Sequence, residues 1–407
     1  MDFHPSPRAA DYLQRLTEFQ QQEILPREHD YHRELLARAD PWVVLPIIEE
    51  LKRQARERGL WNLFLPDPER GAGLSNVEYA PLAEAMGGSL ITALVCNCNA
   101  PDTGNMEVLW HFGTDAQKQR WLDPLLDGSI RSAFCMTEPD VASSDATNMQ
   151  ATATLEGDEV VVTGRKWWST GVGHPDCRVA IYMGLTDPQA DRYHQHSMVL
   201  VPLDSPGVEI VRMLPVMGFF DAPIGHGEVA FRDVRLPADA IIGGPGQAFT
   251  IAQARLGPGR VHHCMRLIGL AEAALGLACE RAVARTAFGR PLANLGGNRE
   301  RIADARIAID QARLHVLHAA WLLDEQRSES LGAVSQIKVA VPNMAQRVVD
   351  MAIQLHGGAG LSDDLPLAAA WSVARALRMA NGPDEVHRGV IARLELARHG
   401  HGKWAAT

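Results

Sequence analysis

Residues 134–145 (FCMTEPDVASSD) bring together side chains that could hold a flat or anionic ligand. Small and hydroxyl-bearing residues in this segment expose backbone N–H groups and let a ligand approach the chain closely. The segment stands where a helical pattern gives way to a strand pattern, so it is predicted to be a turn. From its residues alone, a ligand-binding turn and a purely structural turn are equally compatible.

A second segment, residues 164–171 (GRKWWSTG), places two tryptophans beside two hydroxyl groups after a predicted strand. A tryptophan can form a wall against a ring-shaped cofactor, and Thr170 can supply a hydrogen bond. Aromatic pairs are more commonly part of a hydrophobic core. By itself, this segment therefore indicates a cofactor only weakly.

Two further segments could contact phosphates. Residues 285–290 (RTAFGR) place two arginines around a glycine at the end of a predicted helix, and arginine binds phosphate through paired hydrogen bonds. Residues 354–360 (QLHGGAG) end an apolar helix with glycines that could accept a pyrophosphate. Solvated arginines and a helix C-cap are the structural alternatives.

The pattern of apolar residues divides the chain into three parts. Apolar residues recur every three or four positions from about residue 12 to 126, which predicts helices. Short β-branched runs then predict strands at 151–155, 160–162, 179–181, 198–201 and 229–231. After the glycine-rich residues 243–246 the helical period returns, with long helices at 302–323 and 334–355. We expect domains at residues 1–133, 134–243 and 244–407.

The predicted fold class is α+β and mostly α, with a helical N-terminal domain, a central antiparallel β-barrel or sandwich, and a C-terminal helical bundle. The net charge of -10 argues against a nucleic-acid partner, because binding phosphates requires clustered cations. The chain lacks a long apolar stretch and a signal-like start, which predicts a cytoplasmic protein without a membrane span. The six cysteines match no zinc spacing and residues 28–32 suit a solvated helix face, so we predict reduced thiols and no metal.

Taken together, the four segments and their order resemble the acyl-CoA dehydrogenase family. The family's TEP turn and its KxW(I/S)(T/S), RxxFG and Q(x)xGGxG elements all have counterparts, and the resemblance covers about residues 30–398. TEPDVASSD, RLGPGRVHHCMR and GPDEVH are most similar to the branch that in animals is fused to a kinase-like domain. The resemblance implies a C-terminal four-helix bundle, FAD, α,β-dehydrogenation of an acyl-CoA in fatty acid metabolism, and an electron-transfer flavoprotein as partner.

The resemblance also implies roles for individual residues. Flavin contacts are implied for Met136, Thr137, Trp168, Ser169 and Thr170, with Thr170 near flavin N5. Ser144 would lie by the CoA thioester. The ADP half of FAD would be bound across a dimer interface, in a homodimer or homotetramer, by Arg285, Thr286, Phe288, Gln354, Gly357 and Gly358. The segment that closes over the flavin and adenine is matched by Pro383, Asp384 and Glu385.

The chain departs from the family pattern at the catalytic base. The family's glutamate aligns with Asn381, and the alternative position before Arg260 is Gly259. A neutral amide cannot accept the α-proton of a thioester. Asp384 and Glu385 would share a face with Asn381 if a helix ran there, so either could be the base.

Three other features affect the expected site. The TEP turn is one residue longer than the common form, so Ser144 is assigned by its neighbour Asp145. The family's glutamine after RxxFG falls at Gly296, with Asn298 only nearby. His262 and His263, near Arg260, are further base candidates, although packed or solvent-exposed histidines are the commoner case.

Three functions fit these observations. The first is an acyl-CoA dehydrogenase that passes electrons to an electron-transfer flavoprotein. The second is a related flavin oxidase, such as a nitroalkane-type oxidase, and the third is a catalytically weak FAD-bound scaffold, because Asn381 replaces the usual glutamate. Deamidation of the Asn381-Gly382 pair would offer an aspartate as base, because a following glycine hinders that reaction little.

Overall fold

The structure, a computed structural model, describes residues 5–401 and, of Leu256, only the backbone. The ends of the first and third predicted domains, residues 1–4 and 402–407, lie outside the described residues. The helices are α1 (Pro7–Phe19), α2 (Leu25–Leu36), α3 (Pro46–Glu57), α4 (Asn76–Gly87), α5 (Thr92–Val95), α6 (Asp102–Phe112), α7 (Asp115–Gln117), α8 (Asp123–Asp127), α9 (Ala248–Ala284), α10 (Asn298–Asp324), α11 (Ser330–His356), α12 (Gly358–Leu361), α13 (Leu367–Ala376) and α14 (Asp384–Arg398). The strands are β1 (Arg131–Cys135), β2 (Thr152–Glu156), β3 (Glu159–Thr170), β4 (Cys177–Leu185), β5 (His196–Pro202), β6 (Val208–Met213), β7 (His226–Pro237), β8 (Thr286–Ala287) and β9 (Arg290–Pro291).

The chain forms two compact units, and neither is a continuous stretch of sequence. The helical unit comprises residues up to 28, residues 74–93 and residues from 257 on. The sheet unit comprises residues 29–73 and 94–256. Segments from the first third of the chain therefore contribute to both units.

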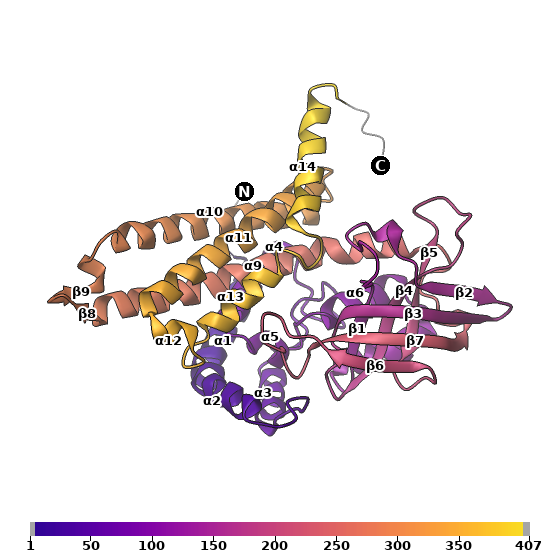
Figure 1. Ribbon diagram of the computed structural model, residues 1–407, viewed down its shortest axis with the longest axis horizontal. Coiled ribbons are helices and arrows are strands. Elements are labelled where there is room, and N and C mark those ends of the chain that lie inside the picture. Colours follow the sequence, from indigo (N-terminus) through magenta and orange to yellow (C-terminus); the bar gives the residue numbers. More distant parts are fainter. Residues whose placement is uncertain (1–4, 402–407) are drawn as a thin grey trace. The chain divides into compact units, whose positions relative to one another are not determined.

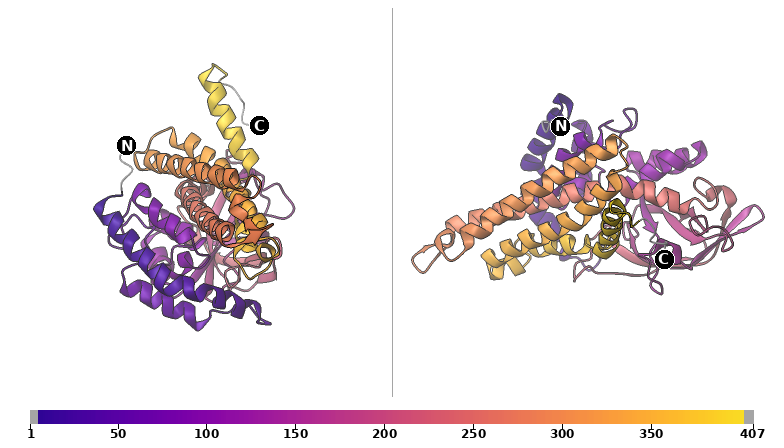
Figure 2. Two further views of the ribbon diagram at one scale, coloured as in Figure 1. Left: turned by 90° about the vertical axis from the view of Figure 1, so that its left-hand side faces the viewer. Right: turned by 90° about the horizontal axis from the view of Figure 1, so that it is seen from above.

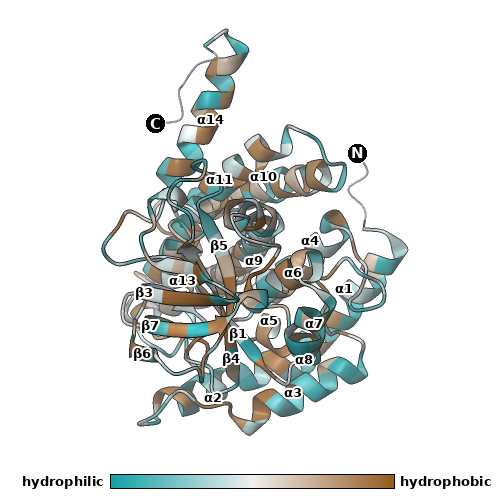
Figure 3. Ribbon diagram, turned by 90° about the vertical axis from the view of Figure 1, so that its right-hand side faces the viewer, coloured by the Kyte–Doolittle hydropathy of each residue, from teal (hydrophilic) through white to brown (hydrophobic). Residues whose placement is uncertain are grey.

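The sheet unit is built on a seven-stranded sheet in the order β1-β4-β2-β3-β7-β6, with β5 on β4 (Figure 1). Its core is made of small and β-branched residues with two aromatic rings, Tyr182 and Phe231, whose centroids are 4.8 Å apart. Both β3 and β7 carry hydrophobic stretches next to hydrophilic ones (Figure 3). Strands β4 and β5 are buried along almost their whole length, whereas the edge strand β6 is exposed.

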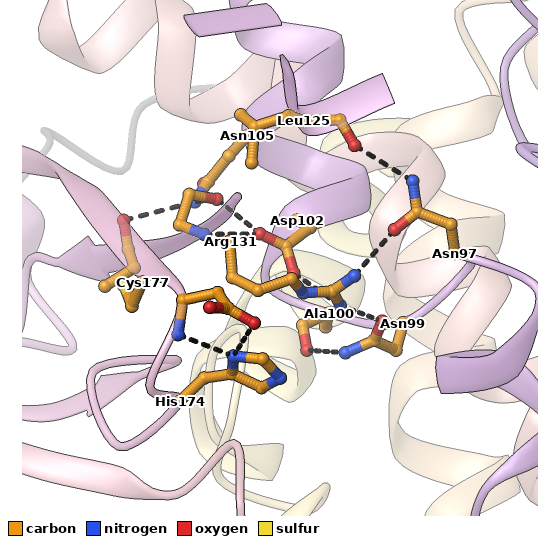
Figure 4. A network of polar contacts seen from close by, with 12 residues as sticks. Asn97, Asn99, Ala100, Asp102, Asn105, Leu125, Arg131, His174 and Cys177 are labelled. Atoms are coloured by element: carbon orange, nitrogen blue, oxygen red, sulfur yellow. Dashed lines mark hydrogen bonds and ion pairs between the residues drawn. The ribbon is translucent and has the colours of Figure 1, made fainter. Parts of the chain in front are cut away.

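A buried polar network joins α6 to β1 (Figure 4). Arg131 Nη2 lies 2.7 Å from Asp102 Oδ2, and both side chains are only 3% exposed. Asp102 Oδ1 accepts hydrogen bonds from the Ser132 backbone N–H and hydroxyl, and Arg131 also donates to Asn97. Because every charge in this cluster is paired, the start of β1 is held in one position on α6.

The helical unit contains long helices that lie side by side, α9, α10 and α11 (Figures 1 and 2). Helices α4 and α9 cross with their backbones in contact, since a Cβ on Gly269 would lie 1.8 Å from the Glu84 carbonyl oxygen. Arg313 on α10 forms ion pairs with Glu84 of α4 and Glu272 of α9. Small residues and one arginine thus hold three helices together.

The predicted order of helices, strands and helices is confirmed, as are the hairpin of β2 and β3 and the long helices α10 and α11. The predicted antiparallel pairing holds for most strands, but β1 and β4 pair in parallel. A parallel pair requires a long connection, which the β2–β3 hairpin supplies. The pattern did not reveal β1 or β6. β6 is an exposed edge strand without a continuous apolar face.

Three properties bear on location and metals. No helix in the described part of the chain is long and apolar enough to cross a membrane. None of the six cysteines forms a disulfide, and five of them are buried. Among residues 5–401, no group of three or more histidine, cysteine or acidic side chains could hold a metal ion.

Candidate functional site

In the sheet unit, a buried ion pair ties two of the segments singled out from the sequence to each other. Lys166 Nζ lies 2.7 Å from Glu138 Oε1 and donates a hydrogen bond to the Met136 carbonyl at 2.9 Å. Glu138 also accepts from the backbone N–H groups of Gln150 and Ala151. The TEP turn is thus bonded to β3 and to the start of β2. Burial lowers the pKa of Lys166, while Glu138 opposes that shift.

Beyond Lys166, β3 turns Trp168 outward, whereas Trp167 stays half-buried. Its register against β7 shifts between Lys166 and Ser169, as in a β-bulge, and Trp168 has the left-handed φ of 50°. Such a conformation is rare for a bulky residue, and bulges commonly re-aim side chains at functional sites. Trp168 is 39% exposed as a result. The backbone N–H of Trp167 donates to the Thr137 carbonyl, and this bond keeps the TEP turn beside the end of β3.

The predicted flavin-contact residues of the sheet unit are therefore brought together, with two qualifications. Met136, Thr137 and Thr170 are partly exposed, but Ser169 is fully buried, backbone included, so the structure does not place it where a ligand could contact it. In the longer turn, the Ser143 hydroxyl accepts from the Glu138 N–H at 2.9 Å, whereas Ser144 is exposed. Ser143 closes the turn, and Ser144 is the residue free to meet a ligand.

The sequence assigned no role to two residues of the sheet unit, Glu107 on α6, which is buried, and Arg255 on α9, which is half-buried. The Arg255 guanidinium lies 4.0 Å from the Phe134 ring centroid and donates to Asn105, and its Nε has no hydrogen-bond partner in the described structure. A Cβ on Gly104 would lie 2.8 Å from that Nε. Burial raises the pKa of Glu107 to about 8, partly offset by Arg255. Nothing in the local sequence pattern marks either residue, because their burial depends on tertiary packing.

In the helical unit, the RxxFG element forms a hairpin of β8 and β9 at the end of α9 (Figure 1). Phe288 and Gly289 both have left-handed φ, at 51° and 76°, as a tight two-residue turn requires. The Phe288 side chain is 96% exposed, and Arg285 and Thr286 are exposed beside it. The hairpin thus presents one large apolar ring beside exposed polar and charged residues.

The glycine element follows the end of α11. Gly357 has φ 64°, and a Cβ on Gly357 or Gly358 would meet no atom within 4 Å. The backbone at this helix end is therefore open to a ligand. Gln354, one turn earlier, is exposed and lines a groove of about 570 Å³ between α10 and α11.

The position of the family's glutamate lies in a left-handed turn rather than in a helix. Asn381 and Gly382 have φ of 59° and 100°, and asparagine tolerates this conformation better than most residues. The Asn381 carbonyl accepts from Arg260 Nε at 3.1 Å and lies 3.2 Å from His387 Nε2. Lys338 donates to the Leu377 carbonyl at 2.5 Å and lies 3.4 Å from the Gly382 carbonyl. These contacts hold the turn, so the condition that one helix links Asn381 to Asp384 and Glu385 is not met.

The two acidic base candidates have different surroundings. Asp384, the first residue of α14 after Pro383, is buried and bonded through Oδ2 to Arg378 at 2.9 Å and to Asn343 at 3.0 Å. Its Oδ1 has no hydrogen-bond partner among the described residues. The Glu385 side chain is 79% exposed and lies 3.7 Å from Arg388. Asp384 therefore anchors α14, and Glu385 is accessible.

The two histidine candidates are packed or paired. His262 is buried edge-on against Tyr79, with ring centroids 4.8 Å apart, and burial lowers its pKa to about 3. His263 Nδ1 lies 3.1 Å from Arg266 Nη2. His262 is too buried to act as a general base, and the contact with Arg266 occupies Nδ1 of His263.

Comparisons with known proteins agree on one family. Family models match the N-terminal domain of acyl-CoA dehydrogenase at residues 7–129, the middle domain at 133–234 and the C-terminal domain at 246–396. The mouse protein named acyl-CoA dehydrogenase family member 10 is 53% identical over 96% of this chain, which spans 37% of the length of that protein.

Two mycobacterial proteins match over nearly their whole length. The Mycobacterium tuberculosis protein named probable acyl-CoA dehydrogenase FadE2 is 52% identical over 98% of both chains. A solved structure of a candidate acyl-CoA dehydrogenase from Mycobacterium abscessus is 67% identical, with a TM-score of 0.95 over 97% of this chain and 100% of that chain. Both the sequence and the fold of this chain are thus those of the family.

Replacing Lys166 tests how much the buried Lys166–Glu138 ion pair contributes to the stability of the fold. Lys166→Met leaves the Glu138 carboxylate buried without its partner, so the free energy of unfolding should fall by about 3–5 kcal/mol. Lys166→Met combined with Glu138→Gln should recover part of this loss. Arg235→Met, which breaks an exposed ion pair at the far end of β7, should leave stability unchanged. Urea unfolding of the three variants measures this; equal effects of Lys166→Met and Arg235→Met would contradict the assignment.

Glu107 should make stability depend on pH. Its folded pKa of about 8 lies above its ordinary value of 4.5, so the native state keeps a proton that the unfolded chain releases. Stability should therefore fall as pH rises from about 4.5 to 8, by about 1.4 kcal/mol per pKa unit at most. Glu107→Gln should flatten this part of the profile. Parallel wild-type and variant profiles from denaturant titrations between pH 5 and 8 would refute the prediction.

Proposed function

The chain belongs to the acyl-CoA dehydrogenase family, and from this premise we propose that it binds FAD and catalyses the α,β-dehydrogenation of an acyl-CoA thioester. The observation that carries the proposal is the end of β3. There, Trp168 is 39% exposed and has a left-handed conformation beside the TEP turn. A hydrophobic core would have buried this ring. A flat ligand would cover it.

The residues of both units fit FAD chemically. In the sheet unit, Trp168 offers a ring surface and Thr170 a hydroxyl group for the flavin, while Ser144 is accessible to a thioester ligand. In the helical unit, the open backbone at Gly357 and Gly358 and the exposed Arg285 suit a pyrophosphate. When bound, FAD supplies a two-electron acceptor at flavin N5.

We assign the proton transfer to the acidic residues at the start of α14. Glu385 is the accessible carboxylate, whereas Oδ2 of Asp384 is already bonded to Arg378 and Asn343. Arg260 holds the Asn381 carbonyl and so positions the turn that precedes both acids. Glu385 is the first candidate for removing the α-proton, with Asp384 the second. Asn381, at the family's usual position, is a conformational residue unless deamidation converts it to aspartate.

Oligomerisation and electron transfer complete the proposal. The 96% exposure of Phe288 at the hairpin tip supports a surface that a second copy covers, in a homodimer or homotetramer that shares the ADP sites. Electrons would pass to an electron-transfer flavoprotein. An oxidase and a weakly active FAD-bound scaffold remain the alternatives, and the amide at Asn381 is the observation that favours the scaffold.

Purified protein should be yellow, and its flavin should bleach anaerobically with at least one member of an acyl-CoA panel. Bleaching without oxygen uptake in air distinguishes a dehydrogenase from an oxidase. A protein that binds FAD but is not bleached by any acyl-CoA would support the scaffold. If no FAD is taken up on reconstitution, the proposed function is wrong.

Substitution of the acids separates the two base candidates. Glu385→Gln should lower the rate of flavin reduction by about 100-fold or more without changing the melting temperature, because its carboxylate carries no buried contact. Asp384→Asn should lower the melting temperature, because Arg378 loses its buried partner. Glu395→Gln, an exposed acid further along α14, is the matched control and should change neither value.

Three outcomes decide the assignment of the base. If Asp384→Asn abolishes flavin reduction and Glu385→Gln leaves its rate unchanged, Asp384 is the base. Unchanged rates in both would refute the assignment. If the Asn381 peptide then proved one mass unit heavy, deamidation would supply the base.

A further inference from the structure

His226 is bonded to the hydroxyl group that the proposed function puts next to the flavin. His226 and Thr170 are directly opposite each other on the antiparallel strands β7 and β3, and His226 Nδ1 lies 3.0 Å from Thr170 Oγ1. The imidazole ring also lies against Trp168, with ring centroids 5.9 Å apart. None of the four motifs includes His226, so the sequence offered no signal for it.

The protonation state of His226 decides what Thr170 can do. Burial lowers the pKa of His226 to about 4, so the ring is neutral near pH 7 and carries a single N–H. Nε2 lies 3.8 Å from Asp221 Oδ2, beyond hydrogen-bond distance, and the negative charge of that carboxylate favours an N–H over a lone pair at Nε2. Nδ1 is then an acceptor, and the Thr170 O–H donates to it.

We propose that His226 is a positioning residue. Its Nδ1 accepts a hydrogen bond from the Thr170 hydroxyl group, so that the Thr170 oxygen presents a lone pair to the bound flavin. This inference rests on the proposed function. Oxidised flavin N5 accepts hydrogen bonds, whereas reduced flavin carries a proton there and donates. A threonine held as an acceptor therefore favours the reduced cofactor and raises its reduction potential.

Two substitutions separate this role from general packing. Asparagine at position 226 can place an acceptor where Nδ1 stands, whereas leucine removes it. We expect His226→Asn to keep the wild-type flavin potential and His226→Leu to make it more negative and to shift the visible absorption bands of the oxidised flavin. His194→Leu, which changes an exposed histidine of the same unit, should leave both unchanged. Dye-coupled anaerobic titration of the FAD-loaded protein measures the potential.

A double-mutant comparison tests whether His226 acts through Thr170. In a Thr170→Val background, His226→Leu should cause no further shift, because the hydroxyl that it directs is gone. An unchanged potential in His226→Leu, or an equal shift in both backgrounds, would overturn the proposal. If His226→Leu does not fold, His226→Gln serves in its place, because its amide reaches the Nε2 position and leaves Nδ1 empty. Failure of the wild-type protein to take up FAD would instead refute the proposed function.

Discussion

The Lys166–Glu138 pair is the interaction on which the arrangement of the TEP turn and the end of β3 depends. Its lysine is 0% and its glutamate 6% exposed, so neither charge is stabilised by water and each needs the other. The pair also bonds the Met136 carbonyl and two backbone N–H groups at the start of β2. One pair of charges therefore fixes the TEP turn relative to β3, and with it the relation of Thr137 to Trp168.

Unusual backbone conformations occur where tertiary contacts can hold them. Trp168 at φ 50° follows the register shift of β3, and Asn381 at φ 59° is held by bonds to its carbonyl. Each conformation costs free energy that only surrounding structure can offset. The first turns an aromatic ring outward, and the second sets where α14 begins. In each unit, a residue in a strained conformation thus determines the direction of a specific side chain or helix.

Asn381, the position that the resemblance aligns with a catalytic glutamate, also has a conformational role. An asparagine suits a left-handed position, and Arg260 and His387 both bind its carbonyl group rather than its side chain. The backbone geometry of this turn therefore does not need a carboxylate at position 381. The proposed acid chemistry lies at the start of α14, where Asp384 also has a structural bond to Arg378.

By itself, the sequence determined the order of helices, strands and helices and the hairpin of β2 and β3, and it indicated the segments that we propose to bind a ligand. These features depend on local periodicity and on short motifs, which are read along the chain. Only the tertiary structure decided that β1 pairs in parallel with β4, that Ser169 faces the core, and that Asp384 is buried while Glu385 is not. It alone brought His226 to Thr170 and Glu107 near Arg255. These pairs are 56 and 148 residues apart, and contacts over such separations depend on packing that no local pattern records.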